Sequence, residues 1–130
     1  MRRQMSSSST AMADLFPNLP TLDPERVAML HELCVDAGPG VLQEIVESWQ
    51  TEASRHLAGA EQAMQAADVP QTKAAAHALK GSCGNMGVAR LAELGRQLEL
   101  KAHLPEEAPL VLAEMRAEFD RARQQLAQLS

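Results

Sequence analysis

The sequence contains few of the residues that favour β-sheets. Among 130 residues there are no tyrosines, one tryptophan, two phenylalanines and one isoleucine, against 22 alanines and 17 leucines. Aromatic and β-branched side chains suit a pleated sheet, whereas alanine and leucine lose little side-chain freedom in a helix. The composition therefore predicts an all-α protein. A hydrophobic fraction of 45% excludes a disordered chain, and the length suits a single domain.

Runs of basic residues and long apolar stretches are also missing. The formal net charge is −5, and no segment is rich in lysine or arginine. A nucleic-acid-binding face needs clustered basic side chains, and stacking onto bases needs aromatic ones. No apolar stretch approaches the ~18 residues that indicate a membrane-spanning helix. We therefore expect neither a nucleic-acid partner nor a membrane partner.

Cysteine is scarce as well, and the chain start carries no leader pattern. Cys34 and Cys83 are too few for a disulfide framework, and no apolar segment follows the initial Met-Arg-Arg. These features predict a cytoplasmic protein with reduced thiols. Residues 1–20 are serine-rich and polar, so we expect a flexible N-terminal tail. The folded domain is then predicted over residues 21–130.

Apolar residues recur at three- and four-residue steps along the rest of the chain and predict five helices. The first is short and begins at Asp23-Pro24-Glu25, an N-cap followed by proline at the first helical position. The longer helices are expected over about residues 40–67, 68–86, 88–104 and 106–129. Because their connections are short, neighbouring helices should run antiparallel. The expected fold is an antiparallel up-down four-helix bundle with a short extra N-terminal helix.

The third of these helices contains two interior glycines, Gly81 and Gly84. Each costs about 1 kcal/mol relative to alanine, so something should offset that cost. At about 100° per residue, both glycines share a face with His77 and Lys80. The apolar stripe lies opposite and comprises Thr72, Ala75, Leu79, Cys83 and Met86. We therefore expect His77 to be exposed, beside a lysine and two positions without side chains.

This face suggests a chemistry. At cellular pH a partly neutral imidazole has a nucleophilic ring nitrogen, and Lys80 can meet a negative group placed on it. The pattern predicts a phosphoryl-accepting histidine, with glycines that clear the path for a docking protein. A solvated surface histidine beside simple packing notches is the alternative reading.

The run His77-Ala-Leu-Lys-Gly-Ser-Cys-Gly-Asn-Met-Gly87 resembles the motif of histidine-containing phosphotransfer domains. That motif reads His-x-Leu-Lys-Gly-Ser-Ser/Ala, then three variable positions ending in an apolar one, then glycine. The resemblance extends over about residues 20–129. Cys83 departs from the usual serine or alanine, but it lies on the core-facing side, where it acts as a small hydrophobe.

The resemblance implies a mechanism and roles for individual residues. Such domains take a phosphoryl group from an aspartate of one receiver domain, hold it on histidine and pass it to another receiver. By resemblance, His77 is phosphorylated on Nε2 and Lys80 stabilises the phosphoryl oxygens. Gly81 and Gly84 give the receiver access, and Ser82 supports the helix locally.

In the family, a glutamate or glutamine of the next helix often hydrogen-bonds the imidazole. The matching position is Glu99 or, failing that, Gln97. A carboxylate on Nδ1–H would set the tautomer and leave Nε2 as the nucleophile, although a solvated helix charge is the other reading of Glu99. Receiver docking would also use apolar positions beside His77, such as Val88, which we expect to be exposed.

The sequence contains no Gly-rich nucleotide loop, no Walker motif and no acidic pocket for Mg²⁺. By resemblance, the receiver supplies the metal and the acceptor carboxylate. We therefore expect a phosphoryl carrier and not an enzyme, without a cofactor or metal of its own. The expected partners are receiver domains of a hybrid sensor histidine kinase and of response regulators, and the expected state is a monomer.

Two other functions remain as alternatives. A metal-binding bundle could use the i, i+4 pairs Glu52/His56 and Glu99/His103, but di-iron bundles use Glu-x-x-His, and these pairs lie on the helix flanks. A helical adaptor in which His77 is never phosphorylated is the second alternative. Retention of both that histidine and the neighbouring lysine weakens it.

Overall fold

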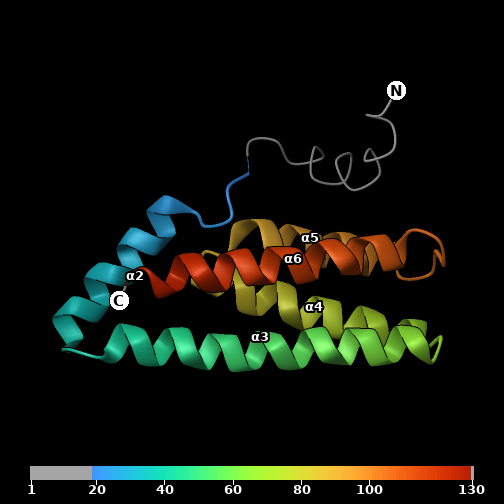
Figure 1. Cartoon of the computed structure of the whole chain (residues 1–130), viewed down its shortest axis with the longest axis horizontal. Coiled ribbons are helices and arrows are strands. Elements are labelled where there is room, and N and C mark those ends of the chain that lie inside the picture. The colour runs from blue at the N-terminus through green and yellow to red at the C-terminus, as the bar shows by residue number, and fades with distance from the viewer. Residues whose placement is uncertain (1–18, 130) are drawn as a thin grey trace.

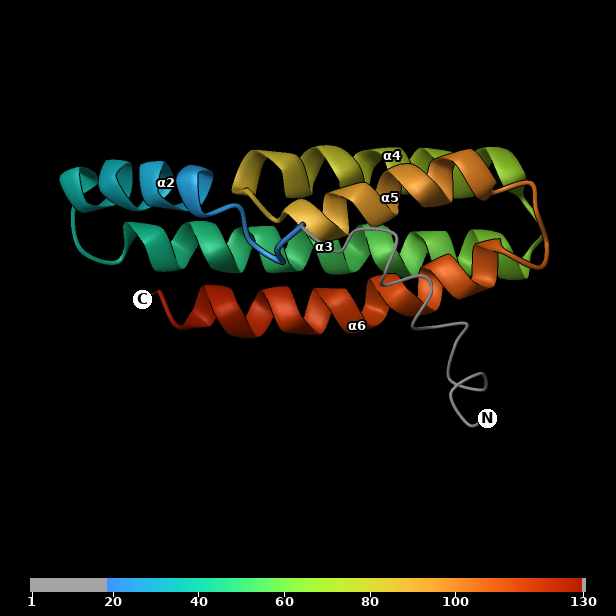
Figure 2. The same cartoon turned by 90° about the horizontal axis from the view of Figure 1, so that it is seen from above.

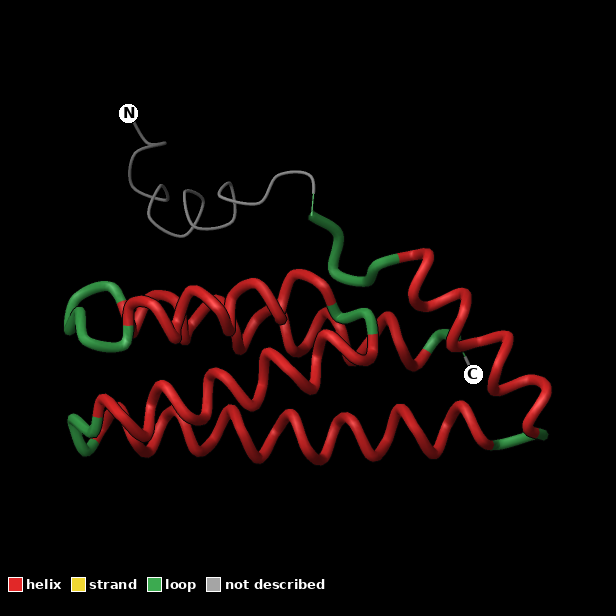
Figure 3. Tube along the Cα trace, turned by 180° about the vertical axis from the view of Figure 1, so that it is seen from behind, coloured by secondary structure: helices red, strands yellow, loops and turns green. Residues whose placement is uncertain are grey.

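The computed structural model describes residues 19–129, which form five helices and, within that range, no strand (Figure 3). Helices α3 to α6 pack in sequence, and α6 returns to α3 to close the bundle, while α2 extends beyond one end (Figures 1 and 2). The bounds are α2 Pro24–Ala37, α3 Val41–Gln65, α4 Val69–Met86, α5 Ala89–Lys101 and α6 Ala108–Ala127. The predicted all-α bundle with a short N-terminal helix is confirmed. The predicted tail lies almost wholly outside the described residues.

The helices begin and end close to the predicted residues. Asp23 and Asp68 cap α2 and α4, since each side chain accepts a hydrogen bond from a first-turn backbone N–H. These bonds satisfy donors that have no partner within the helix. Helix α4 ends at Gly87, whose φ of +74° is a left-handed conformation that glycine adopts without strain. Two predicted bounds were wrong, because α5 ends at Lys101 and α6 begins only at Ala108.

The core is mainly aliphatic and lies between α3, α4, α5 and α6. Its fully buried large side chains include Leu57, Leu79, Leu91, Leu98, Met115 and Leu126. The predicted stripe on α4 was slightly misplaced, since Ala76 is fully buried and Ala75 only half-buried. The predicted apolar stripe on α6 is buried at Met115, Ala122 and Leu126 and half-buried at Leu112, Phe119 and Leu129, whereas the fully buried Glu118 was not foreseen. In both cases the buried face is centred between two neighbouring helices, which a wheel drawn for one helix does not show.

Helix α4 packs between α3 and α5, and its outer side is covered by neither. The start of α2 is bonded to the C-terminal end of α4, because the backbone N–H of Asp23 donates to the carbonyl of Gly87 at 2.7 Å. Arg26 adds a hydrogen bond from Nε to the carbonyl of Asn85 at 3.3 Å. These two bonds fix the start of α2 against the C-terminal end of α4. Among the described residues, no helix has the length and apolarity to cross a bilayer.

Candidate functional site

His77 lies midway along α4, and its side chain is 66% exposed. Gly81 and Gly84 are exposed on the same face, and a Cβ added at either would meet no heavy atom within 4 Å. The open approach predicted for this histidine is therefore present. We refer to His77, Lys80, Gly81 and Gly84 as the histidine face.

Glu99 reaches from α5 to two residues of the histidine face. Its Oε2 lies 3.1 Å from Nδ1 of His77, and its Oε1 accepts a hydrogen bond from Nζ of Lys80 at 3.2 Å. The predicted contact is thus made by Glu99 and not by Gln97, whose side chain donates to Glu93 instead. The hydrogen bond to Glu99 forms when Nδ1 carries the proton, which leaves the lone pair on Nε2.

The carboxylate of Glu99 is stabilised in its charged form. Partial burial acts to raise the pKa of Glu99, but hydrogen bonds from Lys80 and His77 and the charges of both residues outweigh it. The pKa of Glu99 therefore lies below its usual value. At neutral pH the site holds an anionic anchor between a lysine and an imidazole. The pairing of Lys80 with Glu99 was not predicted, because it depends on how close two helices lie.

Val88 was wrongly predicted to be an exposed docking position. It has no exposed surface and belongs to the core, because the turn between α4 and α5 carries its side chain inward. Ser82 is half-buried, and its Oγ has no hydrogen-bond partner among the described residues. Cys83 is fully buried, and burial raises the pKa of its thiol to about 12 despite the neighbouring Trp49. Cys83 is therefore a protonated core residue, as its position on the wheel predicted.

The residue pairs behind the metal-site alternative do not combine into one site. Nε2 of His56 lies 3.7 Å from Oε2 of Glu52 on α3, while the carboxylate of Glu99 faces α4. His103 is exposed on the loop that follows α5. Over the described part of the chain, no three histidine, cysteine, aspartate or glutamate residues are grouped to hold a metal ion.

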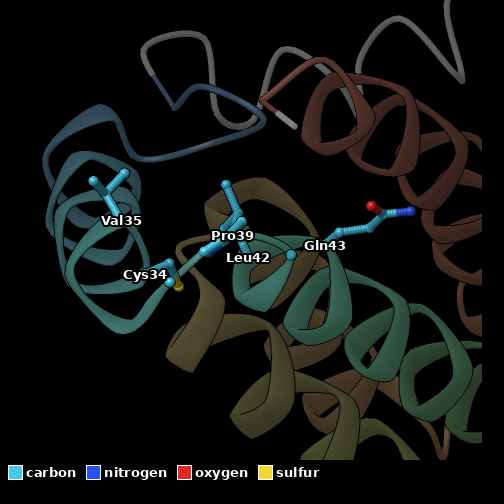
Figure 4. A pocket seen from close by; sticks show the side chains of 7 residues that line it. Cys34, Val35, Pro39, Leu42 and Gln43 are labelled. Atoms are coloured by element: carbon cyan, nitrogen blue, oxygen red, sulfur yellow. The ribbon is translucent and has the colours of Figure 1, made fainter.

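Among the hollows on the described part of the molecule, two are lined by residues of α2, α3 or α4 near the C-terminal end of α4 or the turn after α2. One lies at the turn between α2 and α3 and is lined by residues that include Cys34, Val35, Pro39, Leu42 and Gln43 (Figure 4). Neither His77 nor Glu99 lines it. The other is an open groove between α3 and α4, to which α4 contributes Ser82 and Asn85. Since Ser82 follows Gly81, this second groove adjoins the histidine face.

Gly95 was not singled out from the sequence. It is buried within α5, one turn before Glu99, where an added Cβ would lie 3.2 Å from the carbonyl oxygen of Ala76. The sequence feature that could have indicated Gly95 is its place as a glycine inside a helix, four residues before Glu99, the carboxylate expected to reach His77.

Comparisons with known proteins identify the family of the chain. The family model of the Hpt domain matches residues 44–125. Histidine-containing phosphotransfer protein B (HptB) from Pseudomonas aeruginosa has a similar structure, with a TM-score of 0.74 and 29% identity, over 84% of this chain and 93% of that chain. A rice protein described as a putative histidine-containing phosphotransfer protein shares the fold, with a TM-score of 0.73 and 22% identity over 97% of this chain and 95% of that chain. No curated protein matches the chain.

The fold and the matched family define a phosphoryl-carrying helical bundle. The chain belongs to the Hpt domain family, which confirms the resemblance seen in the motif. Its function is histidine phosphotransfer in phosphorelays, and proteins of this family are phosphocarriers rather than kinases.

Proposed function

We propose that His77 carries the phosphoryl group, on Nε2, between receiver domains. The observation that supports this most is the contact of Glu99 with Nδ1 at 3.1 Å, on a histidine that is 66% exposed. A carboxylate on Nδ1–H selects the tautomer whose lone pair is on Nε2. The same carboxylate stabilises the positive charge that the ring acquires when Nε2 forms a bond to phosphorus.

The imidazole of His77 is the only group of this chain that forms a covalent bond in the transfer step. Nε2 attacks the phosphorus of the receiver's aspartyl phosphate, the bond from phosphorus to the carboxylate oxygen breaks, and its electron pair returns to the aspartate. Transfer to a second receiver is the reverse step onto another aspartate. The receiver would bring its own metal ion.

Lys80 is proposed to stabilise the phosphoryl oxygens. In the unphosphorylated protein its Nζ lies on Glu99 at 3.2 Å, while its side chain is 34% exposed. A lysine has a flexible stem and a compact charge, so Nζ can move from the carboxylate to a phosphoryl group on the neighbouring imidazole. Glu99 therefore keeps Lys80 beside the reacting atom before the phosphoryl group arrives.

The proposed partners are receiver domains of a hybrid sensor histidine kinase and of response regulators, which bind a monomer of this chain. They would approach over Gly81 and Gly84, where no side chain blocks the imidazole, and over Ser82 in the adjoining groove. We propose the cytoplasm as the compartment, which suits two unpaired cysteines.

Transfer of labelled phosphate from a phosphorylated receiver to the wild type and to His77→Gln tests the proposal. We expect a label on the wild type that is lost in acid and stable in alkali, as for a phosphorus–nitrogen bond, and none on His77→Gln. His103→Gln is the matched control, since His103 is also exposed but lies outside the histidine face. Equal labelling of wild type and His77→Gln, or labelling of neither by any receiver tested, would contradict the proposal and favour an adaptor.

A further inference from the structure

Gly95 marks a close approach of two helix backbones. An added Cβ would lie 3.2 Å from the carbonyl oxygen of Ala76, and 3.4 Å from both Cβ and the backbone nitrogen of Lys80. The nearest of these atoms is a backbone oxygen inside α4, which cannot move unless the helix moves. Since glycine is unfavourable within a helix, this close approach is a reason for its presence.

The contact lies directly behind the histidine face. Ala76 precedes His77, and Lys80 is one turn further along α4. Glu99 is one turn after Gly95, on the same side of α5. The separation of α4 and α5 at Gly95 therefore sets how far the Glu99 carboxylate must reach to contact Nδ1 and Nζ.

A second interior glycine provides an internal comparison. Gly59 lies on α3, on the other side of α4, and a Cβ there would be 3.9 Å from Cβ of Ala75. That is ordinary van der Waals contact, so alanine fits at Gly59 without moving either helix. Alanine at Gly95 requires a shift of a few tenths of an ångström between α4 and α5.

We propose that Gly95 is a positioning residue: by carrying no side chain it holds α5 against α4, so that Glu99 stays on Nδ1 of His77. The inference rests on the proposed role of His77 as phosphoryl acceptor. If α5 moves away from α4, the hydrogen bond between Nδ1 of His77 and Oε2 of Glu99, now 3.1 Å, becomes longer. The fraction of neutral imidazole that carries its proton on Nδ1 then falls. Because a misplacement of ~1 Å can cost about 100-fold in rate, a shift of a few tenths should cost severalfold.

The test compares Gly95→Ala with Gly59→Ala. The first readout is the tautomer of His77, taken from the ¹⁵N chemical shifts of its ring nitrogens in the neutral state and assigned with His77→Gln. The second is the rate of phosphorylation by phosphoramidate, a small donor that needs no receiver docking. In that reaction Nε2 attacks phosphorus, the phosphorus–nitrogen bond of the donor breaks, and ammonia leaves.

We expect Gly95→Ala to shift the tautomer toward Nε2–H and to slow phosphorylation severalfold, and Gly59→Ala to match the wild type. Glu99→Ala should move both readouts further in the same direction. Glu99→Gln should keep the wild-type tautomer, because its amide oxygen still accepts from Nδ1–H. If Gly95→Ala loses thermal stability, both readouts are taken below the temperature at which circular dichroism shows unfolding.

A wild-type tautomer and rate in folded Gly95→Ala, or equal shifts in both glycine variants, would overturn the inference and leave the proposed function standing. A different outcome would contradict the proposed function instead. In that case neither phosphoramidate nor receivers phosphorylate the wild type, while the tautomer shift is still specific to Gly95→Ala, and the positioning role of Gly95 is retained.

Discussion

The outer face of α4 and its contact with α5 use glycine in opposite ways. At Gly81 and Gly84 an added Cβ meets nothing within 4 Å, whereas at Gly95 it meets a backbone oxygen at 3.2 Å. Glycine inside a helix is unfavourable in both places. On the outer face no contact within the described fold offsets this cost, and we propose that a docking receiver uses the open space. At the contact with α5 the compensation comes from a closer approach of two helices within the same chain.

The largest expected effect is on receiver docking over the outer face of α4. It is distinguished from an effect on the reactivity of His77 by comparing a receiver with a small phosphoryl donor. Gly81→Gln places a long side chain beside His77, at a position where an added Cβ meets no heavy atom within 4 Å. We expect transfer from a phosphorylated receiver to slow by about tenfold or more, since ~1.4 kcal/mol of lost docking energy already gives tenfold. Phosphorylation by phosphoramidate should stay near the wild-type rate. An unchanged rate with the receiver would show that the partner does not approach over this face.

An intermediate effect concerns folding stability. Gly84→Ala should raise the free energy of unfolding by about 0.5–1 kcal/mol, because alanine favours the helix and its methyl group meets open solvent. Gly95→Ala should not show this gain, since its methyl group presses on α4. Urea unfolding of the two variants measures the difference. Equal stabilisation of both would mean that the helices at Gly95 are not closely packed.

The smallest expected effect is a pH dependence at the contact between α4 and α5. The pKa of Glu99 is lowered in the folded protein by Lys80 and His77 despite the opposing effect of burial. The unfolded chain therefore binds more protons in the acid range. The stability that Glu99 contributes is complete above the unfolded carboxyl pKa of about 4.3 and is lost as pH falls through its lower folded pKa.

Replacement of this carboxylate tests that linkage. Glu99→Gln should reduce stability near neutral pH relative to wild type, and the difference should shrink as the solution is acidified. Glu32→Gln, at an exposed position on α2 outside its first turn, is the control for removal of a surface carboxylate. Thermal unfolding measured across the acid range provides both comparisons. A difference between wild type and Glu99→Gln that is constant with pH would contradict the account of Glu99.

The sequence predicted the histidine face well because that face belongs to one helix. The positions of His77, Lys80, Gly81 and Gly84 follow from the rotation of about 100° per residue, which neighbouring helices hardly alter. The contact from Glu99 was expected from the family motif. The contact between Lys80 and Glu99 was not expected, because it depends on the distance between α4 and α5.

The errors also lie where two or more elements meet. Val88 was taken as exposed because it was assigned to an apolar docking patch beside His77. Its burial depends on how the turn from α4 to α5 sits over the core. Glu118 was not expected to be buried. It is fully buried on α6, against which both α3 and α5 pack. Arg121 donates to one oxygen of its carboxylate at 2.8 Å.

The sequence by itself determined the helical class, most helix starts and the residues of the histidine face. These features depend on contacts between residues at most four positions apart, such as the Asp68 cap and the periodic apolar stripe. Only the tertiary structure decided that Glu99 and not Gln97 contacts His77, that Lys80 shares this carboxylate and that Gly95 brings it within reach. Those contacts depend on the separation of two helices, which is set by packing across the whole bundle.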